Sequence, residues 1–116
     1  MGYMHKVFLM DDSGIYECSN CGTHLAQKDQ IYSKEYNGQY GRAYLFNKAI
    51  NICPGEEDKR SMTTGVHIVR DISCMDCRKY VGWMYITAFE RKQKFKEGKF
   101  ILEKELINDV TQEWKL

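Results

Sequence analysis

The sequence predicts a mainly β domain built from antiparallel strands and cross-braced through four cysteines. Three observations lead to this fold class. Six runs are rich in Val, Ile, Tyr, Phe and Thr with partial period-two alternation, which is typical of strands. Helical patterns are nearly absent, and two Cys-x-x-C motifs stand far apart in the chain. A chain of 116 residues suits a single domain with a modest core.

The expected strands follow one another along the chain and are separated by short turn signals. An Asn-Gly step at 37–38 predicts a tight turn. Pro54 and Gly55 predict a polar turn over 54–58 that breaks any strand there. Residues 89–98 predict a short helical segment. The six expected strands are 14–19, 30–36, 42–52, 65–74, 81–89 and 98–107.

Composition and charge argue against several classes of protein. With 17 basic and 16 acidic residues, the net charge of +1 provides no general attraction to nucleic acid or to an anionic membrane. No apolar run approaches the roughly 20 residues of a membrane span. The apolar patch at 7–10 runs into Asp11 and Asp12, so it is too short for a secretory signal. We therefore expect an intracellular protein, cytoplasmic or nuclear, in a reducing compartment.

That compartment determines how the five cysteines are interpreted. Cys18 and Cys21 form one Cys-x-x-C motif, Cys74 and Cys77 form a second, and Cys53 stands alone. Paired motifs of this kind in a reducing compartment favour a metal over disulfides. Four thiolates suit Zn²⁺, which has no geometric preference of its own and binds sulfur at about 2.3 Å. The sequence predicts one zinc ion held by these four cysteines.

Two other uses of the first motif are weaker. A thioredoxin-like redox pair begins a helix, and no helical run follows Cys21. His24 lies three residues further on, but four cysteines already complete a closed tetrahedral site, so we expect a loop histidine there. A closed site has no open coordination position, which predicts a structural rather than a catalytic zinc.

The spacing of further residues resembles that of the Yippee family of small eukaryotic zinc-binding proteins. The blocks "GRAYLFN", "TGVHIVRDISC" and "FKEGKFILE" carry the resemblance, which covers nearly all of 18–103. It implies an N-terminal extension over 1–13, a Yippee zinc-binding domain over 14–110 and a C-terminal tail over 111–116. Besides the four cysteines, the matching positions are Gly41, Leu45, Asn51, Gly65, Gly82, Trp83, Tyr85, Lys96 and Glu103.

The resemblance implies a β-tent fold, in which two antiparallel sheets meet near a zinc ion bound by two Cys-x-x-C hairpins. The same fold is similar to that of the thalidomide-binding domain of cereblon, of B-type methionine sulfoxide reductases, and of the RNA-binding terminal domain of certain immune helicases. One scaffold thus serves a binder, an enzyme and a nucleic-acid reader, so the fold alone does not assign the function.

Trp83 and Tyr85 are the main candidates for a ligand pocket. They match the "GW-x-aromatic" strand that supplies part of the aromatic cage of cereblon, although the other two cage tryptophans are not matched. Phe46 and His67 are further candidates for lining a different pocket. The alternative is that Trp83 and Tyr85 are core aromatics that cover the zinc hairpin, since large aromatic side chains usually lie in cores.

An enzyme and a nucleic-acid binder remain as alternatives. A sulfoxide reductase needs a thiol outside the zinc site, and Cys53 has no resolving cysteine. The basic run at 89–100 contains Phe89, Phe95 and Phe100, but charge-dominated binding needs a clear basic excess. We expect this run to be a solvated edge whose aromatic side chains pack inward.

The function predicted from these observations is a non-enzymatic, zinc-stabilised binding or adaptor module with protein partners. The resemblance implies regulatory roles and places some relatives with a multi-subunit ubiquitin ligase of the CTLH (GID) type, in which this chain would act as an exchangeable adaptor. A small-ligand or RNA-binding β-tent domain is the alternative function. We expect neither nucleic acid nor a membrane to be a partner.

Overall fold

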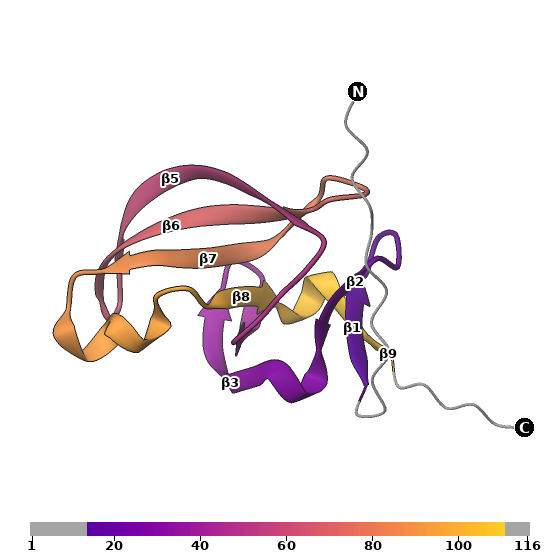
Figure 1. The fold of residues 1–116 in the computed structure, drawn as a ribbon, viewed down its shortest axis with the longest axis horizontal. Helices are drawn as coiled ribbons and strands as arrows, with labels where there is room; N and C mark the ends of the chain where they lie inside the picture. Colours follow the sequence, from indigo (N-terminus) through magenta and orange to yellow (C-terminus); the bar gives the residue numbers. More distant parts are fainter. Residues whose placement is uncertain (1–13, 111–116) are drawn as a thin grey trace, which may run out of the picture.

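Two antiparallel sheets form the part of the chain described by the computed structural model, residues 14–110 (Figure 1). This confirms the predicted fold class. The predicted extension over 1–13 and tail over 111–116 lie outside the described residues. No helix within 14–110 is long and apolar enough to span a membrane.

The described residues contain nine strands and three short 3₁₀ helices, which are labelled η1 to η3. The 3₁₀ helices are η1 (Lys28–Gln30), η2 (Arg91–Lys96) and η3 (Lys104–Leu106). The strands are β1 (Ile15–Cys18), β2 (His24–Gln27), β3 (Ile31–Gly38), β4 (Gly41–Phe46), β5 (Ile52–Met62), β6 (Gly65–Cys74), β7 (Tyr80–Ala88), β8 (Phe100–Glu103) and β9 (Ile107–Val110).

The smaller sheet has the order β2-β1-β9, and the larger one has the order β3-β4-β8-β7-β6-β5. In Figure 1, β5, β6 and β7 arch over one side of the molecule, while β3 lies on the opposite side. The two edge strands of the larger sheet are therefore β3 and β5, which lie on opposite sides of the molecule.

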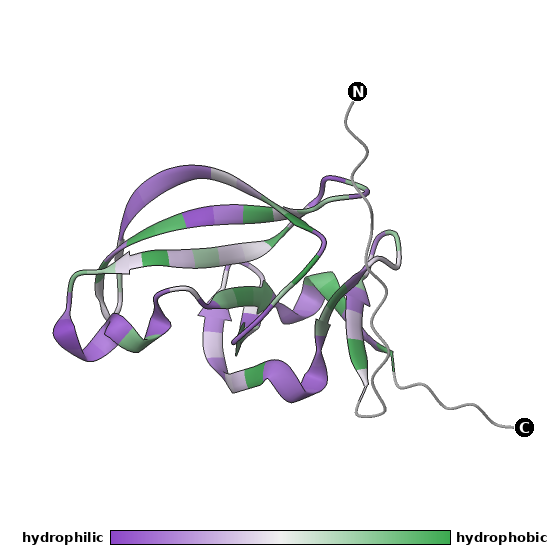
Figure 2. Cartoon of the chain, viewed as in Figure 1, coloured by the Kyte–Doolittle hydropathy of each residue, from purple (hydrophilic) through white to green (hydrophobic). Residues whose placement is uncertain are grey.

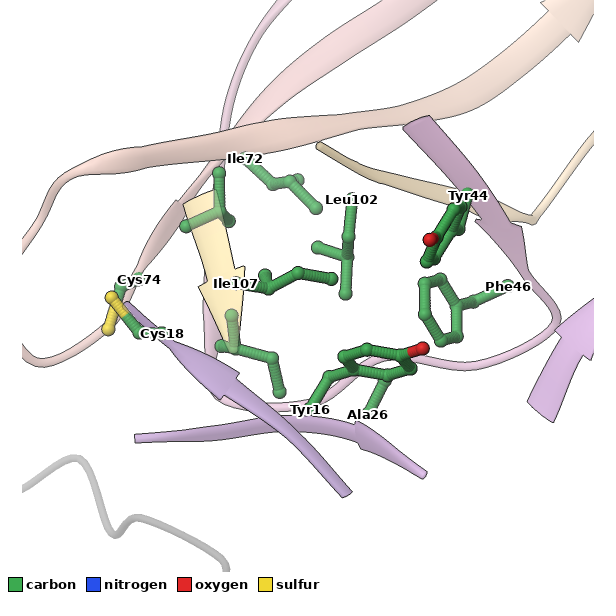
Figure 3. Packing of buried hydrophobic residues seen from close by; sticks show 11 residues of the cluster. Tyr16, Cys18, Ala26, Tyr44, Phe46, Ile72, Cys74, Leu102 and Ile107 are labelled. Atoms are coloured by element: carbon green, nitrogen blue, oxygen red, sulfur yellow. The ribbon is translucent and has the colours of Figure 1, made fainter. Parts of the chain in front are cut away.

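Two core clusters lie on opposite faces of the larger sheet, and strand alternation sorts residues between them. On β4, Tyr44 and Phe46 belong to one cluster, whereas Ala43 and Leu45 belong to the other. The first cluster joins the two sheets (Figure 3) and contains Tyr16, Cys18, Leu25, Ala26, Tyr44, Phe46, Ile72, Cys74, Val81, Leu102 and Ile107. The second contains Ala43, Leu45, Val69, Trp83, Tyr85 and Ile101.

The polar turn predicted over 54–58 is wrong, because β5 runs straight through these residues. Its pairing with β6 slips between Pro54 and Glu57, which marks a bulge. Proline lacks a backbone N–H and is tolerated at bulges and on edge strands. Since β5 is an edge strand, most residues along its length remain exposed to water. Figure 2 shows that this strand is mainly hydrophilic.

Two expected strands are shorter than predicted. The run at 42–52 leaves the sheet after Phe46, and Asn51 has a positive φ of 56° that a strand does not allow. Its side-chain amide donates a hydrogen bond of 2.7 Å to the His24 carbonyl, which fixes this left-handed turn. The run at 98–107 is divided by η3, so its two halves, β8 and β9, belong to different sheets.

The tight turn predicted near Asn37 forms, but Gly38 lies in the strand rather than in the loop. Gly38 pairs with Gly41, so Gln39 and Tyr40 are the two loop residues. A Cβ at Gly38 would overlap the carboxylate of Glu103, so glycine is needed here for close approach. The short helical segment predicted over 89–98 is confirmed as η2.

We expect Gly82→Ala to destabilise the protein severely, because a Cβ on β7 would overlap the carbonyl oxygen of Ile101 on β8. Such a backbone clash forces the strands apart and costs about 3 kcal/mol or more. Gly55→Ala is the matched control, since the nearest atom to its Cβ is the Asp71 carbonyl oxygen at 3.4 Å. Denaturant unfolding of both variants measures the difference. Equal midpoints for Gly82→Ala and wild type would contradict this account.

Candidate metal centre and aromatic cavity

Four cysteine sulfurs converge where the two sheets meet. Cys18 is the last residue of β1 and Cys74 the last residue of β6, and each strand is followed by a turn that carries the second cysteine, Cys21 or Cys77. All four Sγ atoms lie within 4.8 Å of one another. The Cys18–Cys77 pair is 3.6 Å apart and the Cys21–Cys74 pair 3.5 Å.

This arrangement fits a tetrahedral zinc ion. Four sulfurs at about 2.3 Å from a common centre would be about 3.8 Å from one another. The predicted ligand set is therefore brought together, with every position of the tetrahedron supplied by thiolate. His24 is not part of the cluster of metal-ligating groups, and it begins β2 instead of lying in the predicted loop.

The first cysteine turn is held by two backbone hydrogen bonds. The Cys18 N–H donates to the Thr23 carbonyl at 2.8 Å, and the Gly22 N–H donates back to the Cys18 carbonyl at 2.9 Å. Gly22 has a φ of +81°, which glycine adopts without cost. The turn thus presents both of its sulfurs on one side.

The second cysteine turn repeats this geometry without a glycine. The Cys74 N–H donates to the Lys79 carbonyl at 2.8 Å, and the Arg78 N–H donates to the Cys74 carbonyl at 2.8 Å. Arg78 has a φ of +68°, a left-handed conformation that costs a residue with a side chain roughly 1 kcal/mol. The two metal-binding turns therefore share one backbone geometry, but only the second turn, with Arg78, adopts it at a conformational cost.

Burial and hydrogen bonding shift the pKa values of Cys18, Cys74 and Cys77 in different directions. Burial raises the pKa of Cys18 to about 12 and also raises the pKa of Cys74. At Cys77, burial acts in the same direction but is outweighed by the backbone amide of Lys79 and the side chain of Asn20, which lower its pKa to about 6. Zinc must displace protons from the buried thiols, so its affinity rises with pH.

The larger sheet also borders an open cavity of about 860 Å³. We call it the aromatic cavity. Its wall comes from the two edge strands β3 and β5, from β7, from η2 and from the β3–β4 and β5–β6 turns. The lining residues are Ser33, Glu35, Tyr36, Asn37, Gly38, Gln39, Arg60, Ser61, Met62, Thr63, Thr64, Tyr80, Trp83, Tyr85, Gln93, Phe95 and Lys96.

Trp83 and Tyr85 are both core residues and part of the cavity wall. Their exposed fractions are 7% and 2%, and their rings meet edge to face with centroids 6.3 Å apart. Burial raises the pKa of Tyr85 to about 12. The Trp83 indole opposes this rise, but its Nε1 lacks the geometry of a hydrogen bond to any described residue.

The structure does not place Phe46 or His67 on the cavity wall. Phe46 is fully buried in the cluster between the sheets, edge to face with Tyr16 at 5.7 Å, because alternation turns it to the other face of β4. His67 is fully buried behind Tyr85, with ring centroids 5.2 Å apart. Its Nδ1 lies 3.0 Å from the Gly65 carbonyl oxygen. Of the four candidates, Trp83 and Tyr85 reach the cavity.

Lys96 was not predicted as a site residue, although it belongs to the matched Yippee positions. The basic run was expected to be solvated with aromatic side chains packed inward. Arg91, Lys92 and Lys94 are exposed and Phe100 packs against the core, as expected, but three positions differ. Phe89 and Phe95 are 51% and 41% exposed, whereas Lys96 is only 2% exposed. The Lys96 ammonium has favourable partners inside, with the Tyr36 and Tyr85 ring centroids each 5.3 Å from Nζ.

Glu103 is a second buried charged residue that was not predicted as a site residue, although it also belongs to the matched Yippee positions. Its Oε2 accepts a 2.6 Å hydrogen bond from the Tyr80 hydroxyl, and its Oε1 accepts a 2.9 Å bond from the Tyr40 N–H. Burial and this carboxylate raise the pKa of Tyr80. The contacts tie the β3–β4 loop to β7 and β8, and so close one end of the cavity.

We expect Cys74→Ser to lose zinc and cooperative unfolding, and Cys53→Ser to keep both. Cys53 lies outside the sulfur cluster and is the matched control. Structural zinc contributes about 10–16 kcal/mol, which is comparable with or larger than the roughly 5–15 kcal/mol stability of a whole domain. Metal content and thermal unfolding measure the effect, with chelator added to wild type in parallel. Stoichiometric zinc in Cys74→Ser would contradict the assigned ligand set.

We expect His67→Leu to reduce the acid sensitivity of the fold. Burial lowers the pKa of His67 below 6.5, helped by Lys96 and opposed by the Gly65 carbonyl. The unfolded chain then binds a proton more readily than the native state, so stability is present above about pH 6.5 and falls as the pH drops below it. Urea unfolding of both zinc-loaded proteins at several pH values shows how the free energy of unfolding depends on pH in each. The same pH dependence in His67→Leu and in wild type would show that His67 contributes nothing to the acid sensitivity.

Known proteins support the zinc centre and the fold. The family described as "Yippee zinc-binding/DNA-binding/Mis18, centromere assembly" matches residues 14–114. A yippee-like protein of Solanum tuberosum is 48% identical over 87% of this chain and 79% of its own length. Human yippee-like protein 3 is 45% identical over 84% of this chain and 82% of its own length.

The crystal structure of the Mis18 "Yippee-like" domain has a TM-score of 0.66 to this chain. It covers 84% of this chain and 94% of that chain at 12% identity, and thus shows a shared fold. The names of these relatives refer to no enzyme activity. The family match and the sequence identities together show that this chain belongs to the Yippee family.

Proposed function

We propose that this chain is a non-enzymatic binding module that uses the aromatic cavity to receive a protein partner. The observation that carries the proposal is the position of Trp83 and Tyr85, which lie on the wall of a cavity of about 860 Å³. A cavity of this size holds a few residues of a peptide or a small ligand. Its aromatic wall is of the kind that anchors interfaces.

The zinc centre would act at a distance from the partner. Bound zinc supplies a rigid cross-link between the sheets and no open coordination position. The chain leaves the second cysteine turn at Cys77 and enters β7, which reaches Trp83 six residues later. The turn therefore sets the register of the strand on which the aromatic wall is built.

Binding is better supported than catalysis. The four clustered thiols form the metal site, and the fifth, Cys53, does not line the cavity. The Cys53 Sγ lies 3.7 Å from Arg78 Nη1, beside the metal-binding turn. A sulfoxide reductase that used Cys53 would have its nucleophile away from the aromatic wall. The position of Cys53 therefore favours a binding module over a reductase.

A nucleic-acid partner is less well supported than a protein partner. The family description includes DNA binding. In this chain the net charge is +1 and Lys96, the last residue of the basic 3₁₀ helix, is buried. Binding that depends on phosphate neutralisation needs several exposed cations on one face. We place the protein in the cytoplasm or nucleus and expect protein partners.

Subunits of a CTLH-type (GID) ubiquitin ligase are the first partners to test. The resemblance to the Yippee family motivates this choice, with the chain as an exchangeable adaptor. In such a role the cavity would receive a segment either of the ligase or of its substrate. The two possibilities differ in which proteins are lost when the cavity is blocked.

We expect Ser61→Trp to abolish capture of partners in quantitative affinity purification from the native cells. Ser61 is exposed on β5 at the cavity wall, so the new indole fills the entrance without disturbing the core. Glu56→Trp adds the same side chain at an exposed position on β5 outside the cavity and is the matched control. Both variants must contain one zinc per chain. Unchanged partners with Ser61→Trp would place the interface on another face.

A further inference from the structure

The cavity wall contains a buried positive charge without a negative partner. Lys96 Nζ donates a 2.8 Å hydrogen bond to Thr64 Oγ1, and no carboxylate within residues 14–110 forms an ion pair with it. Burial lowers the pKa of Lys96, and no acidic group opposes that shift. An uncompensated ammonium of this kind makes the wall electropositive.

The other charged groups at the cavity have partners of their own. The Arg60 guanidinium donates to Asp58 Oδ2 at 2.7 Å and to Asp71 Oδ1 at 2.9 Å. Glu35 is exposed on the wall and lies 3.7 Å from Arg42. The Glu103 carboxylate, at the end closed by the β3–β4 loop, accepts hydrogen bonds from Tyr80 and Tyr40. Beside Thr64, the charge that a ligand would meet is that of Lys96.

The aromatic side chains around Lys96 exclude cationic ligands. The ammonium lies 5.3 Å from the ring centroids of both Tyr36 and Tyr85, which is the geometry of a cation–π contact. These two rings are therefore already in contact with a cation of the protein itself, the Lys96 ammonium. A methylated lysine or another ammonium ligand would have to enter beside a fixed positive charge.

Thr64 can transmit this charge to the cavity. Its Oγ1 accepts the hydrogen bond from Lys96, so its own hydroxyl hydrogen remains available to donate. Thr64 is exposed at the cavity wall. A hydroxyl polarised by an ammonium is a stronger donor than an isolated one.

Trp83 contributes ring surface to the same wall rather than a donor. Its Nε1 forms no hydrogen bond to any described residue and is fully buried, so a ligand in the cavity does not reach this N–H. The donor that a ligand can reach is therefore the Thr64 hydroxyl.

We propose that the aromatic cavity binds an oxyanion, a carboxylate or phosphate group of its ligand, with Thr64 as the donor and Lys96 as the compensating charge. This inference rests on the proposed function, since it names the chemistry recognised at the same cavity. The apolar part of the ligand would pack on Met62 and on the small accessible part of the Trp83 ring.

Binding of three small aromatic probes to the full-length, zinc-loaded protein tests the proposal. Benzoate carries a carboxylate, phenyl phosphate carries a phosphate, and benzamide is the neutral analogue of benzoate. Chemical-shift titration of the Trp83 indole N–H gives the dissociation constants. We expect at least one anion to bind about tenfold tighter than benzamide. The comparison of the two anions identifies which group is preferred.

Variants at Thr64 and Lys96 assign the effect to these residues. We expect Thr64→Val to remove the preference for the anion, and Thr64→Ser, which restores the hydroxyl, to keep it. Lys96→Met should lose the preference while it retains zinc, and Thr64→Val provides the answer if Lys96→Met fails to fold. Equal affinities for benzoate and benzamide, no binding of any probe, or unchanged anion binding in Thr64→Val would each overturn the proposal. Partner capture that remains sensitive to Ser61→Trp would leave the binding-module function intact.

Discussion

The cluster of four sulfurs is the constraint on which the rest of the molecule depends. It joins positions 59 and 53 residues apart in the chain, Cys18 with Cys77 and Cys21 with Cys74. A domain of this size buries only about two thirds of its unfolded surface, so its hydrophobic core alone provides a small margin of stability. The smaller sheet contributes just three short strands, and without the metal its main link to the larger sheet would be the packing seen in Figure 3.

The same cross-link organises the cavity, which lies on the other face of the larger sheet. Strand β7 starts directly after the second cysteine turn and crosses the sheet between β6 and β8. Gly82 permits the close approach of β8, and the next residue along the strand, Trp83, reaches the cavity. At the far end, Glu103 holds the β3–β4 loop through Tyr40 and Tyr80. The metal centre, the close approach of β7 and β8 at Gly82, and the buried Glu103 carboxylate thus all help to fix the position of the cavity wall.

The metal ligands and most strands could be predicted because each depends on local residues or on spacing. The cysteine pairs and the β-branched and aromatic runs are signals of this kind. Features that depend on tertiary contacts were not accessible. Pro54 signals a turn locally, but an edge position lets β5 continue past it. From the sequence, Lys96 is expected to be a solvated cation, yet two tyrosine rings from β3 and β7 make its burial favourable. Phe46 was misplaced because the register of β4 determines which face it occupies.

The bulged edge strand β5 also bears on how copies of this protein behave toward one another. It is eleven residues long and borders the larger sheet with one side unpaired, which is a template for strand addition from a second molecule. Pro54 removes one backbone donor from this strand. Glu56, Glu57 and Asp58 place three carboxylates in a row, the last two of which pair with Arg70 and Arg60. An identical edge approaching in antiparallel register would meet the same charges. The irregular, acidic middle of β5 therefore opposes pairing between two such edges, and lets the sheet keep an open edge beside its cavity.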